Sequence, residues 1–457
     1  MTESAAWNRY LEAEAERHIA ELSALLRIPS VSALPEHQSD IAAAADWLVA
    51  YLRRIGVPEV SLLETGAGPV VYGHWPVPGQ PTVLIYGHYD VQPADPLDLW
   101  QTPPFEPTIR DGRLYARGAS DDKGAIFSAI VAVEALTRDG APPLGLKFFI
   151  EGEEEVGSGH LPAFVAAERE RLACDVIVSA DGVMYGRELP SLTIASKGLA
   201  ACQIDLRTAE TDLHSGQFGA AVANAARAMA EMVASFHTAD GRVAVEGFYD
   251  DVRDLTPEER SQIASVPFDE AAFLREINAT EAWGEAGYTL LERVFARPTL
   301  DVNGLWGGFQ GGGAKTVTPC EAHAKVSCRL VPNQDPSRIL DLIERHLQTH
   351  QPTGATATLE RFAGSARPFA IAPDHPALTT AAAVLRDLYD REPLVIRLGG
   401  TLPVAEIFQR ELGADMVFFA WEMPDARLHA PNEFIALDDF QIACRAYCRY
   451  LTALARP

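Results

Sequence analysis

The stretch PTVLIYGHYD, residues 81–90, is an apolar run that ends in an imidazole and a carboxylate. Two later stretches have the same form, LGLKFFIEGEEE at 144–155 and CDVIVSAD at 174–181. Each apolar run has the length of a buried strand, and residues 42–55 and 124–137 have the apolar spacing of helices. Strands that alternate with helices along a chain predict an α/β fold, with a mainly parallel sheet flanked by helices.

The chain is too long for one such layer. A single hydrophobic core stops growing near ~250 to 300 residues, and this chain has 457. The alternation of helix and strand continues to residue 190 and returns after 373, whereas the part between has β-like alternation and an acidic segment. We therefore expect a discontinuous catalytic α/β domain formed by residues 1–190 and 374–457, and an inserted α+β domain at 191–373. Further helices are expected at residues 220–235, 337–349, 377–389 and 437–454.

The composition argues against several kinds of partner. Lys plus Arg number 38 and Asp plus Glu number 63, so the net charge is −25, which repels nucleic acid and anionic lipid. No apolar run approaches the ~20 residues that span a bilayer, and the acidic N-terminal stretch is unlike a signal peptide. The six cysteines are thinly spread without a Cys-x-x-Cys pair, which indicates reduced thiols. We expect a soluble, cytoplasmic protein that binds neither nucleic acid nor membrane.

Polar side chains gather where the predicted strands end. In open α/β sheets, ligands bind beyond the carboxyl ends of the strands, and His88, Asp90, the cluster at 151–155 and Asp181 follow such ends. His88 and Asp90 form a His-x-Asp pair, in which the carboxylate can orient an imidazole that binds zinc. Ordinary loop polarity is the alternative for this pair. Four carboxylates within the five residues 151–155 favour a bound cation over a solvated acidic loop.

Two more segments carry candidate metal ligands. Asp121 and Asp122 precede a predicted helix, which one of them could cap, but two adjacent carboxylates repel each other unless a cation or strong donors compensate. His429 follows another apolar run. With His88 and Asp181, these residues give a set of imidazoles and carboxylates without thiolate. Such a set suits catalytic zinc, manganese or cobalt, and two dications bridged by one carboxylate would need such a ligand set.

A second group of residues suits an organic anion. His214 stands in a small-residue loop, Arg329 follows a strand, and the backbone at Gly400 and Thr401 precedes a predicted helix. A guanidinium can hold a carboxylate bidentately, and free N–H groups at a helix start attract anions. Each residue also has a structural alternative, as a loop histidine, a surface arginine or part of an ordinary helix start.

Eight ordered motifs resemble those of a known family. They are YGHYDVQP (86–93), RGASDDKG (117–124), EGEEEVGSG (151–159), VSAD (178–181), DLHSGQFG (212–219), GAKTVTP (313–319) with CRLVPN (328–333), GGTLPVAE (399–406) and RLHAPNE (427–433). In this order they resemble the dinuclear-zinc metallopeptidase family of carnosinase, cytosolic non-specific dipeptidase, acetylornithine deacetylase and succinyl-diaminopimelate desuccinylase. The resemblance runs from IPSVS at 28–32 to His429, and the long insertion with RPTLDVNGLWGG at 297–308 is most similar to the dipeptidase branch.

The resemblance implies a dinuclear metal centre. Asp121 would bridge two divalent ions, zinc in the family, with manganese or cobalt as alternatives. His88 and Asp181 would hold one ion, and Glu155 and His429 the other. The peptide bond that follows Asp121 would be cis, as in the family.

The resemblance also implies roles outside the metal ligands. Glu154 would be the general base, and Asp90 would orient His88. In a homodimer, His214 would reach the partner subunit's active site and stabilise the oxyanion, and the insertion would be the lid and dimerisation domain. The substrate carboxylate would be held by Arg329, Thr401 and Gly400.

The expected activity is a metal-dependent dipeptidase that hydrolyses an amide bond in short peptides with a free C-terminal carboxylate, using a hydroxide that bridges two metal ions. Leu398 departs from the dipeptidase branch, which has a glutamate at this position that is thought to meet the substrate's free amino group. An N-acyl amino acid deacylase of the same family is therefore an alternative. A metal-free binding protein that kept the fold is a second alternative, which the intact ligand set disfavours.

Overall fold

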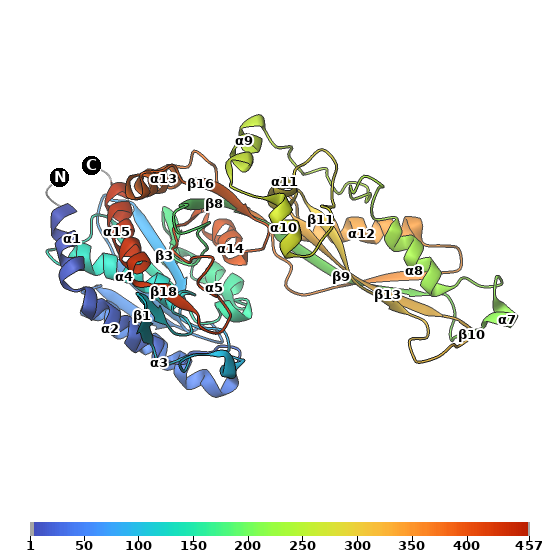
Figure 1. Ribbon diagram of the computed structural model, residues 1–457, viewed down its shortest axis with the longest axis horizontal. Helices are drawn as coiled ribbons and strands as arrows, with labels where there is room; N and C mark the ends of the chain where they lie inside the picture. Colours follow the sequence, from blue (N-terminus) through green and yellow to red (C-terminus); the bar gives the residue numbers. More distant parts are fainter. Residues whose placement is uncertain (1–3, 456–457) are drawn as a thin grey trace. The chain divides into compact units, whose positions relative to one another are not determined.

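The computed structural model describes residues 4–455, which fold into two compact units. The second unit consists of Ala195–Ala370 and the short segment Ile396–Glu406, and the other described residues form the first unit. In Figure 1 the blue N-terminal segments and most of the red C-terminal segments share the first unit. The first unit is therefore discontinuous in sequence, and Ile396–Glu406 belongs to the second unit although it comes late in the chain.

A six-stranded sheet forms the centre of the first unit. Its strand order is β1-β2-β6-β3-β7-β17. The strands are β1 (Glu59–Leu63), β2 (Val70–Trp75), β6 (Gly145–Glu151), β3 (Thr82–His88), β7 (Val176–Ser179) and β17 (Met416–Phe418). The pairs β3–β6, β3–β7 and β7–β17 are parallel, and β1–β2 and β2–β6 are antiparallel. The parallel strands are almost entirely buried, as expected for strands covered on both faces. The predicted α/β class with a mainly parallel sheet is confirmed.

Helices pack on this sheet and on one another. The α helices wholly within the first unit are α1 (Ser4–Ala13), α2 (Ala15–Leu26), α3 (Gln38–Arg54), α4 (Lys123–Thr137), α5 (Leu161–Ala167), α6 (Arg169–Leu172), α13 (Pro376–Tyr389) and α15 (Leu437–Leu454). Helix α4 packs on β3, α2 and α15, and nearly all of its side chains are buried. Helix α3 packs on β1 and β2. The helix α14 (Pro403–Leu412) starts in the second unit's segment and ends in the first unit.

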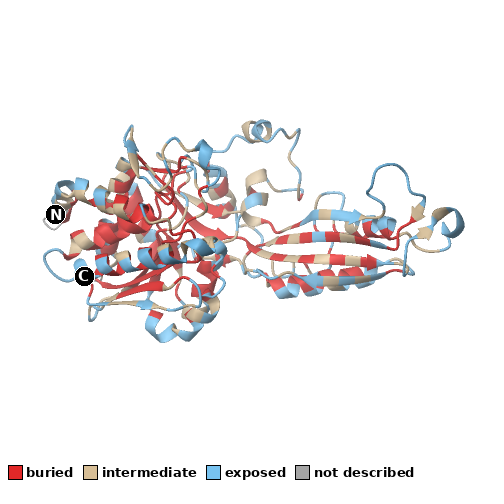
Figure 2. Ribbon diagram, turned by 90° about the horizontal axis from the view of Figure 1, so that it is seen from below, coloured by how far each residue is buried: buried red, intermediate tan, exposed pale blue. Residues whose placement is uncertain are grey.

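The second unit contains a four-stranded antiparallel sheet in the order β11-β13-β9-β14. The strands are β11 (Thr299–Gly307), β13 (Glu321–Leu330), β9 (Gly198–Arg207) and β14 (Thr356–Arg361). Buried and less buried residues alternate along β9 and β13, which is typical of a sheet with one covered face. Figure 2 shows this alternation along the long strands of the second unit.

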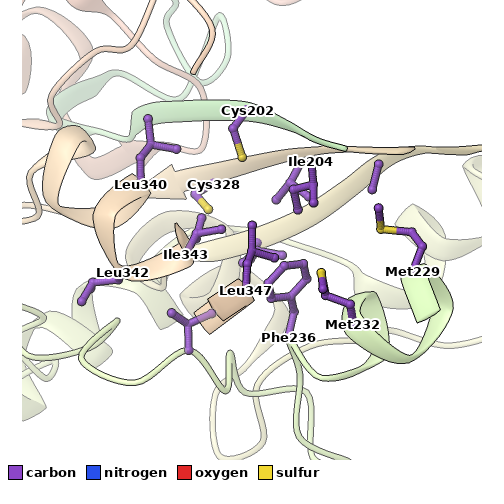
Figure 3. Close-up of a cluster of buried hydrophobic side chains, with 14 of the residues drawn as sticks. Cys202, Ile204, Met229, Met232, Phe236, Cys328, Leu340, Leu342, Ile343 and Leu347 are labelled. Atoms are coloured by element: carbon purple, nitrogen blue, oxygen red, sulfur yellow. The ribbon is translucent and has the colours of Figure 1, made fainter. Parts of the chain in front are cut away.

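Two helices cover the buried face of this sheet. They are α8 (Ala225–Ala234) and α12 (Pro336–His350), both of which contact β9. Figure 3 shows Met229 and Met232 of α8 and Ile343 and Leu347 of α12 in the core that they share with the strands. Helix α8 starts later than the predicted residue 220, because the side chain of Asn224 accepts the N–H of Arg227 and caps the helix there.

Shorter elements complete the structure. The predicted acidic segment forms α9 (Pro257–Ser265) and α10 (Glu270–Glu276), and α11 (Leu290–Ala296) follows them. One small sheet pairs β10 (Leu213–His214) with β12 (Val317–Thr318). A second contains β18 (Phe434–Ala436), β5 (Arg113–Tyr115) and β4 (Thr108–Arg110). A third contains β15 (Phe369–Ala370), β8 (Ser191–Ser196) and β16 (Leu394–Leu398). The remaining helices are α7 (Ser215–Phe218) and the 3₁₀ turns Pro35–His37, Leu97–Leu99 and Glu154–Val156.

The helices and the cysteines can be compared with what the sequence predicts for membrane spans and thiols. Of the helices between residues 4 and 455, none combines the length and the apolarity that crossing a bilayer requires. All six cysteines are free thiols, and all except Cys174 are buried. Their burial agrees with the expectation of reduced thiols in the core.

Candidate metal centre

The carboxyl ends of the parallel strands bring the candidate ligands to one edge of the sheet. Strand β3 ends at His88, and β6 ends at Glu151, the first residue of the acidic cluster. Strand β7, on the other side of β3, ends shortly before Asp181. These residues come from separate segments of the sequence, so their proximity depends on the strand order.

The carboxylate of Asp121 lies between two imidazoles. Its Oδ1 is 3.0 Å from Nε2 of His88, and its Oδ2 is 2.9 Å from Nε2 of His429. Glu155 Oε2 lies 3.3 Å from the same nitrogen of His429. One oxygen of Asp121 therefore faces each imidazole, which is the arrangement that a carboxylate bridging two ions requires. The bond between Asp121 and Asp122 is a cis peptide, as the family resemblance implied.

Asp122 does not cap helix α4, although it occupies the N-cap position. Its Oδ2 instead accepts the backbone N–H of His88 at 2.8 Å. The side chain is fully buried, and its Oδ1 has no hydrogen-bond partner. The capping alternative for this pair of carboxylates is thus wrong, because Asp122 holds the end of β3.

Asp90 contacts two parts of the centre. The Nδ1 of His88 lies 3.0 Å from the carbonyl oxygen of Asp90 and 3.4 Å from its carboxylate. The two carboxylate oxygens accept the backbone N–H groups of Glu154 and Glu155 at 3.2 and 3.1 Å. Asp90 therefore holds the turn that carries the acidic cluster, besides lying against the imidazole that it was expected to orient.

The carboxylates of the acidic cluster have different surroundings. Glu151 accepts hydrogen bonds from Tyr86 and Ser158, at 2.6 and 2.8 Å. Glu153 accepts the backbone N–H of His160 at 3.0 Å, and its other oxygen lies 2.9 Å from that ring's Nδ1. Both glutamates are buried. The alternative of a solvated acidic loop is therefore wrong for these two residues, which are tied into the protein.

Glu155 is held by Gln92, which no pattern in the sequence marked as a site residue. The backbone N–H of Gln92 donates to Glu155 Oε1 at 3.1 Å, and its side-chain amide donates to Oε2 at 2.8 Å. These bonds fix the carboxylate beside His429. The only sequence signal was the position of Gln92 in the motif YGHYDVQP, which contains no charge at this residue.

The electrostatics of the centre favour the binding of a cation. Burial raises the pKa of Glu154 to about 9, and Asp181 adds to this effect while His88 opposes it. Burial also raises the pKa of Asp181 to about 6. The pKa of His429 is raised as well, to about 10, because hydrogen bonding to Asp121 and Glu155 favours its protonated form. Carboxylates crowded in this way are stable as anions only when cations accompany them.

The donor set fits divalent metal ions. The ligand atoms of His88, Asp121 and Glu155 lie within 4.8 Å of one another, a spacing that one or two ions can bridge. Imidazole nitrogen and carboxylate oxygen suit zinc, manganese or cobalt in catalytic sites.

A buried ion pair joins the two loops that bear Asp121 and His429. Glu433, four residues after His429, pairs with Arg117 at 2.7 Å, four residues before Asp121. The same carboxylate accepts the backbone N–H groups of Gly118, Ser120 and Asp121, at distances between 2.9 and 3.1 Å. Arg117 and Glu433 lie in the motifs RGASDDKG and RLHAPNE, and nothing in the sequence indicated that they pair.

The other candidate residues lie in the second unit. Arg329 Nη1 donates to Thr401 Oγ1 at 2.8 Å, which places the two expected carboxylate-binding side chains together. The carbonyl of Gly400 accepts the backbone N–H of Lys197 at 2.9 Å. His214 is exposed, and its Nδ1 accepts the N–H of Gly216 at 3.0 Å. In the neutral ring the proton therefore lies on Nε2, which is free to act as a donor.

Comparisons with known proteins agree with the motifs. A sequence model described as Peptidase family M20/M25/M40 matches residues 84–453. The chain is 29% identical to Cys-Gly metallodipeptidase dug1 of Schizosaccharomyces pombe over 463 residues, which cover 97% of each protein. It is 30% identical to the Beta-Ala-His dipeptidase of Homo sapiens over 386 residues, 83% of this chain and 74% of the human protein.

A solved structure of an M20 family enzyme also resembles this protein. The M20 family metallo-carboxypeptidase Sso-CP2 from Sulfolobus solfataricus matches with a TM-score of 0.79 and 32% sequence identity, over 96% of this chain and 99% of that one. The family resemblance and the dipeptidase branch inferred from the motifs are confirmed by these comparisons.

Proposed function

This chain belongs to peptidase family M20/M25/M40, and on that premise we propose that it is a metal-dependent dipeptidase that cleaves short peptides with a free C-terminal carboxylate. The observation that carries this proposal is the carboxylate of Asp121 between His88 and His429. Its two oxygens face two separate imidazoles, as a bridge between two ions requires.

Five side chains would hold two divalent ions. Asp121 would bridge them, with His88 and Asp181 on one ion and Glu155 and His429 on the other. The bound ions, which we propose to be zinc with manganese or cobalt as alternatives, would polarise the substrate carbonyl and lower the pKa of water. Asp90 would keep His88 and the turn of Glu154 and Glu155 in place.

The remaining steps would depend on side chains of the protein. Glu154 would accept a proton from the attacking water and later return it to the leaving amine. The Nε2–H of His214 would donate a hydrogen bond to the oxyanion of the tetrahedral intermediate. The substrate carboxylate would be bound by Arg329, whose guanidinium can form two parallel hydrogen bonds, together with Thr401 and Gly400.

We further propose a homodimer in which His214 acts in the partner's site. Strand β11 is an edge of its sheet, and its residues Val302, Leu305 and Trp306 are exposed and apolar. An unpaired edge with apolar side chains suits pairing with a second copy. Location in the cytoplasm remains a prediction from the sequence.

One residue favours a second candidate function. Leu398 offers no charge for the free amino group of a dipeptide, so an N-acyl amino acid deacylase with the same metal ligands is the alternative. The experiment that separates the two removes bound metal with a chelator, restores zinc, manganese or cobalt in turn, and assays dipeptides beside N-acetyl and N-succinyl amino acids. Faster hydrolysis of the dipeptides supports the proposal, and exclusive hydrolysis of the acylated substrates contradicts it. A protein that binds no metal and hydrolyses neither class would be a binding protein instead.

A further inference from the structure

Glu422 is a buried carboxylate that has no role in the proposed mechanism. It lies four residues beyond the end of β17, whose neighbour in the sheet is β7. A parallel bridge pairs Glu422 with Val183, and its carbonyl accepts the N–H of Met184 at 2.8 Å. These backbone contacts place Glu422 beside the segment that begins with Asp181, at the same edge of the sheet as the metal ligands.

One carboxylate oxygen of Glu422 has no hydrogen-bond partner although solvent hardly reaches the residue. The residue is 2% exposed, and its Oε1 is fully buried without a hydrogen-bond partner. Its neighbour Trp421 donates from its indole to Tyr389, in the helical layer. A buried carboxylate with an oxygen that accepts no hydrogen bond is costly unless a cation or a proton neutralises the charge.

The charges around Glu422 have mostly its own sign. Burial has the largest effect on the pKa of Glu422 and raises it. The negative charges of Asp121, Asp181 and Asp122 raise this pKa further, whereas the charge of His88 lowers it. Asp121, Asp181 and His88 are the side chains that would hold one of the two ions. Glu155 and His429, which would hold the other ion, are not among these strongest influences.

We propose that Glu422 is an additional carboxylate ligand of the metal centre, directed at the ion that His88 and Asp181 would hold. The inference rests on the proposed metal centre. It gives this ion three carboxylates and one imidazole, counting the bridge of Asp121. Manganese accepts such oxygen-rich, higher-coordinate surroundings more readily than zinc does, because zinc prefers four ligands with nitrogen or sulfur among them. Glu422 therefore biases this position of the centre toward manganese.

A shared proton is the competing explanation. Asp122 also has a buried oxygen without a partner, its Oδ1, while its Oδ2 holds the backbone of His88. Glu422 and Asp122 could neutralise each other as a carboxyl–carboxylate pair, in which case neither would affect metal affinity. The two explanations differ in what happens when Glu422 loses its charge.

The test measures metal binding rather than activity. Full-length wild type, Glu422→Gln and the control Glu151→Gln are stripped with a chelator, and each is titrated with MnCl₂ and with ZnCl₂ by calorimetry and by metal analysis after dialysis. We expect Glu422→Gln to bind one manganese ion at least about 10- to 100-fold more weakly, with a smaller loss for zinc, because even residues that only support metal ligands change the affinity by that factor. Glu151 is an equally buried glutamate of the same region that hydrogen-bonds to Tyr86 and Ser158, so its variant should keep both affinities.

Several outcomes would overturn the inference. Unchanged manganese affinity in Glu422→Gln, or equal losses in the two variants, would assign Glu422 to the shared proton or to packing. Glu422→Met, which removes the charge at similar volume, is measured in parallel, and normal manganese binding by a folded Glu422→Met protein would overturn the inference. If wild type binds no metal, the proposed function fails together with this inference.

Discussion

Arg117 and Glu433 form an ion pair inside the first unit, with Arg117 Nη1 2.7 Å from Glu433 Oε2 and both side chains at most 1% exposed. The pair joins the loop that carries Asp121 to the loop that carries His429. This buried contact therefore helps to set the spacing of two candidate ligands that are far apart in sequence, besides the direct contact between Asp121 and His429. Geometry of this kind can be fixed before any ion binds, which lowers the cost of assembling the centre.

Replacing Glu433 should weaken both folding and metal binding. Glu433→Gln leaves the buried guanidinium of Arg117 without a counter-charge, and losing one partner of such a pair costs about 3 to 5 kcal/mol of unfolding free energy. Urea denaturation of the chelated protein measures this loss, and a zinc titration measures the affinity. Glu231→Gln serves as the control, because its partner Arg227 is exposed and i,i+4 surface pairs contribute only about 0.3 to 0.5 kcal/mol. A Glu433→Gln protein as stable as that control would show that the pair contributes little.

The strand ends could be predicted from the sequence because they depend on local pattern. His88, Glu151 and Asp181 each end or follow a short apolar run, and parallel strands place their carboxyl ends together. Helix α15 also has the predicted bounds, because its apolar spacing is regular from Leu437 to Leu454. Strong local patterns thus predicted both the α/β class and most of the residues that the structure brings together at the candidate metal centre.

Glu154 and Glu155 should respond differently to the same substitution. Glu154→Gln should keep both ions and lower kcat by roughly 10²- to 10⁴-fold, the usual contribution of a general base. Glu155→Gln should weaken one ion, because its carboxylate lies 3.3 Å from His429 Nε2. Metal analysis and steady-state kinetics on the same preparations separate the two effects. Glu153→Gln is the control in this cluster and should keep its metal, since Glu153 bonds to His160. Loss of metal from the Glu154 variant and retention in the Glu155 variant would reverse the two roles.

Other features depend on contacts between distant segments, so local pattern did not indicate them. Glu422 follows an apolar run and looks like a residue leaving a strand, and its burial results from the pairing of β17 with β7. Gln92 acquires its role only when its amide meets Glu155. Asp90 likewise accepts the N–H groups of a turn more than sixty residues away. Local sequence pattern could not indicate this contact either.

Blocking the amino group of a dipeptide should cost little activity. An enzyme that binds the substrate's amino group with a carboxylate leaves that carboxylate unpaired when the amino group is acetylated. Leu398 has no carboxylate to be left unpaired, so N-acetylation should change kcat/KM far less in this protein. The measurement compares each dipeptide with its N-acetyl form. Leu398→Glu should restore discrimination in favour of the free amine. A loss larger than about 10³-fold on acetylation of the wild-type substrate would show that another group binds the amine.

The role of His214 can be separated from that of the metal centre by substitution without disturbing its helix. The ring accepts the N–H of Gly216 and caps α7, so His214→Asn keeps a side chain suited to the cap while it removes the imidazole. If His214 donates to the oxyanion, this variant should keep both metal ions and KM while kcat falls by roughly 10²- to 10³-fold. An unchanged kcat would exclude His214 from catalysis.

Mixed dimers test whether His214 acts in the partner subunit. His214→Asn and Glu154→Gln should each be nearly inactive as homodimers, because one lacks the oxyanion donor and the other lacks the base. In a mixed dimer, the His214→Asn subunit keeps its base and receives an intact His214 from its partner, so one of the two sites is complete. Random exchange of equal amounts gives about half mixed dimers, so roughly a quarter of wild-type activity should return if the interface is symmetric. Subunit exchange is established independently by mass spectrometry of differently tagged chains. Exchange without recovered activity would mean that His214 acts within its own chain or has no catalytic role.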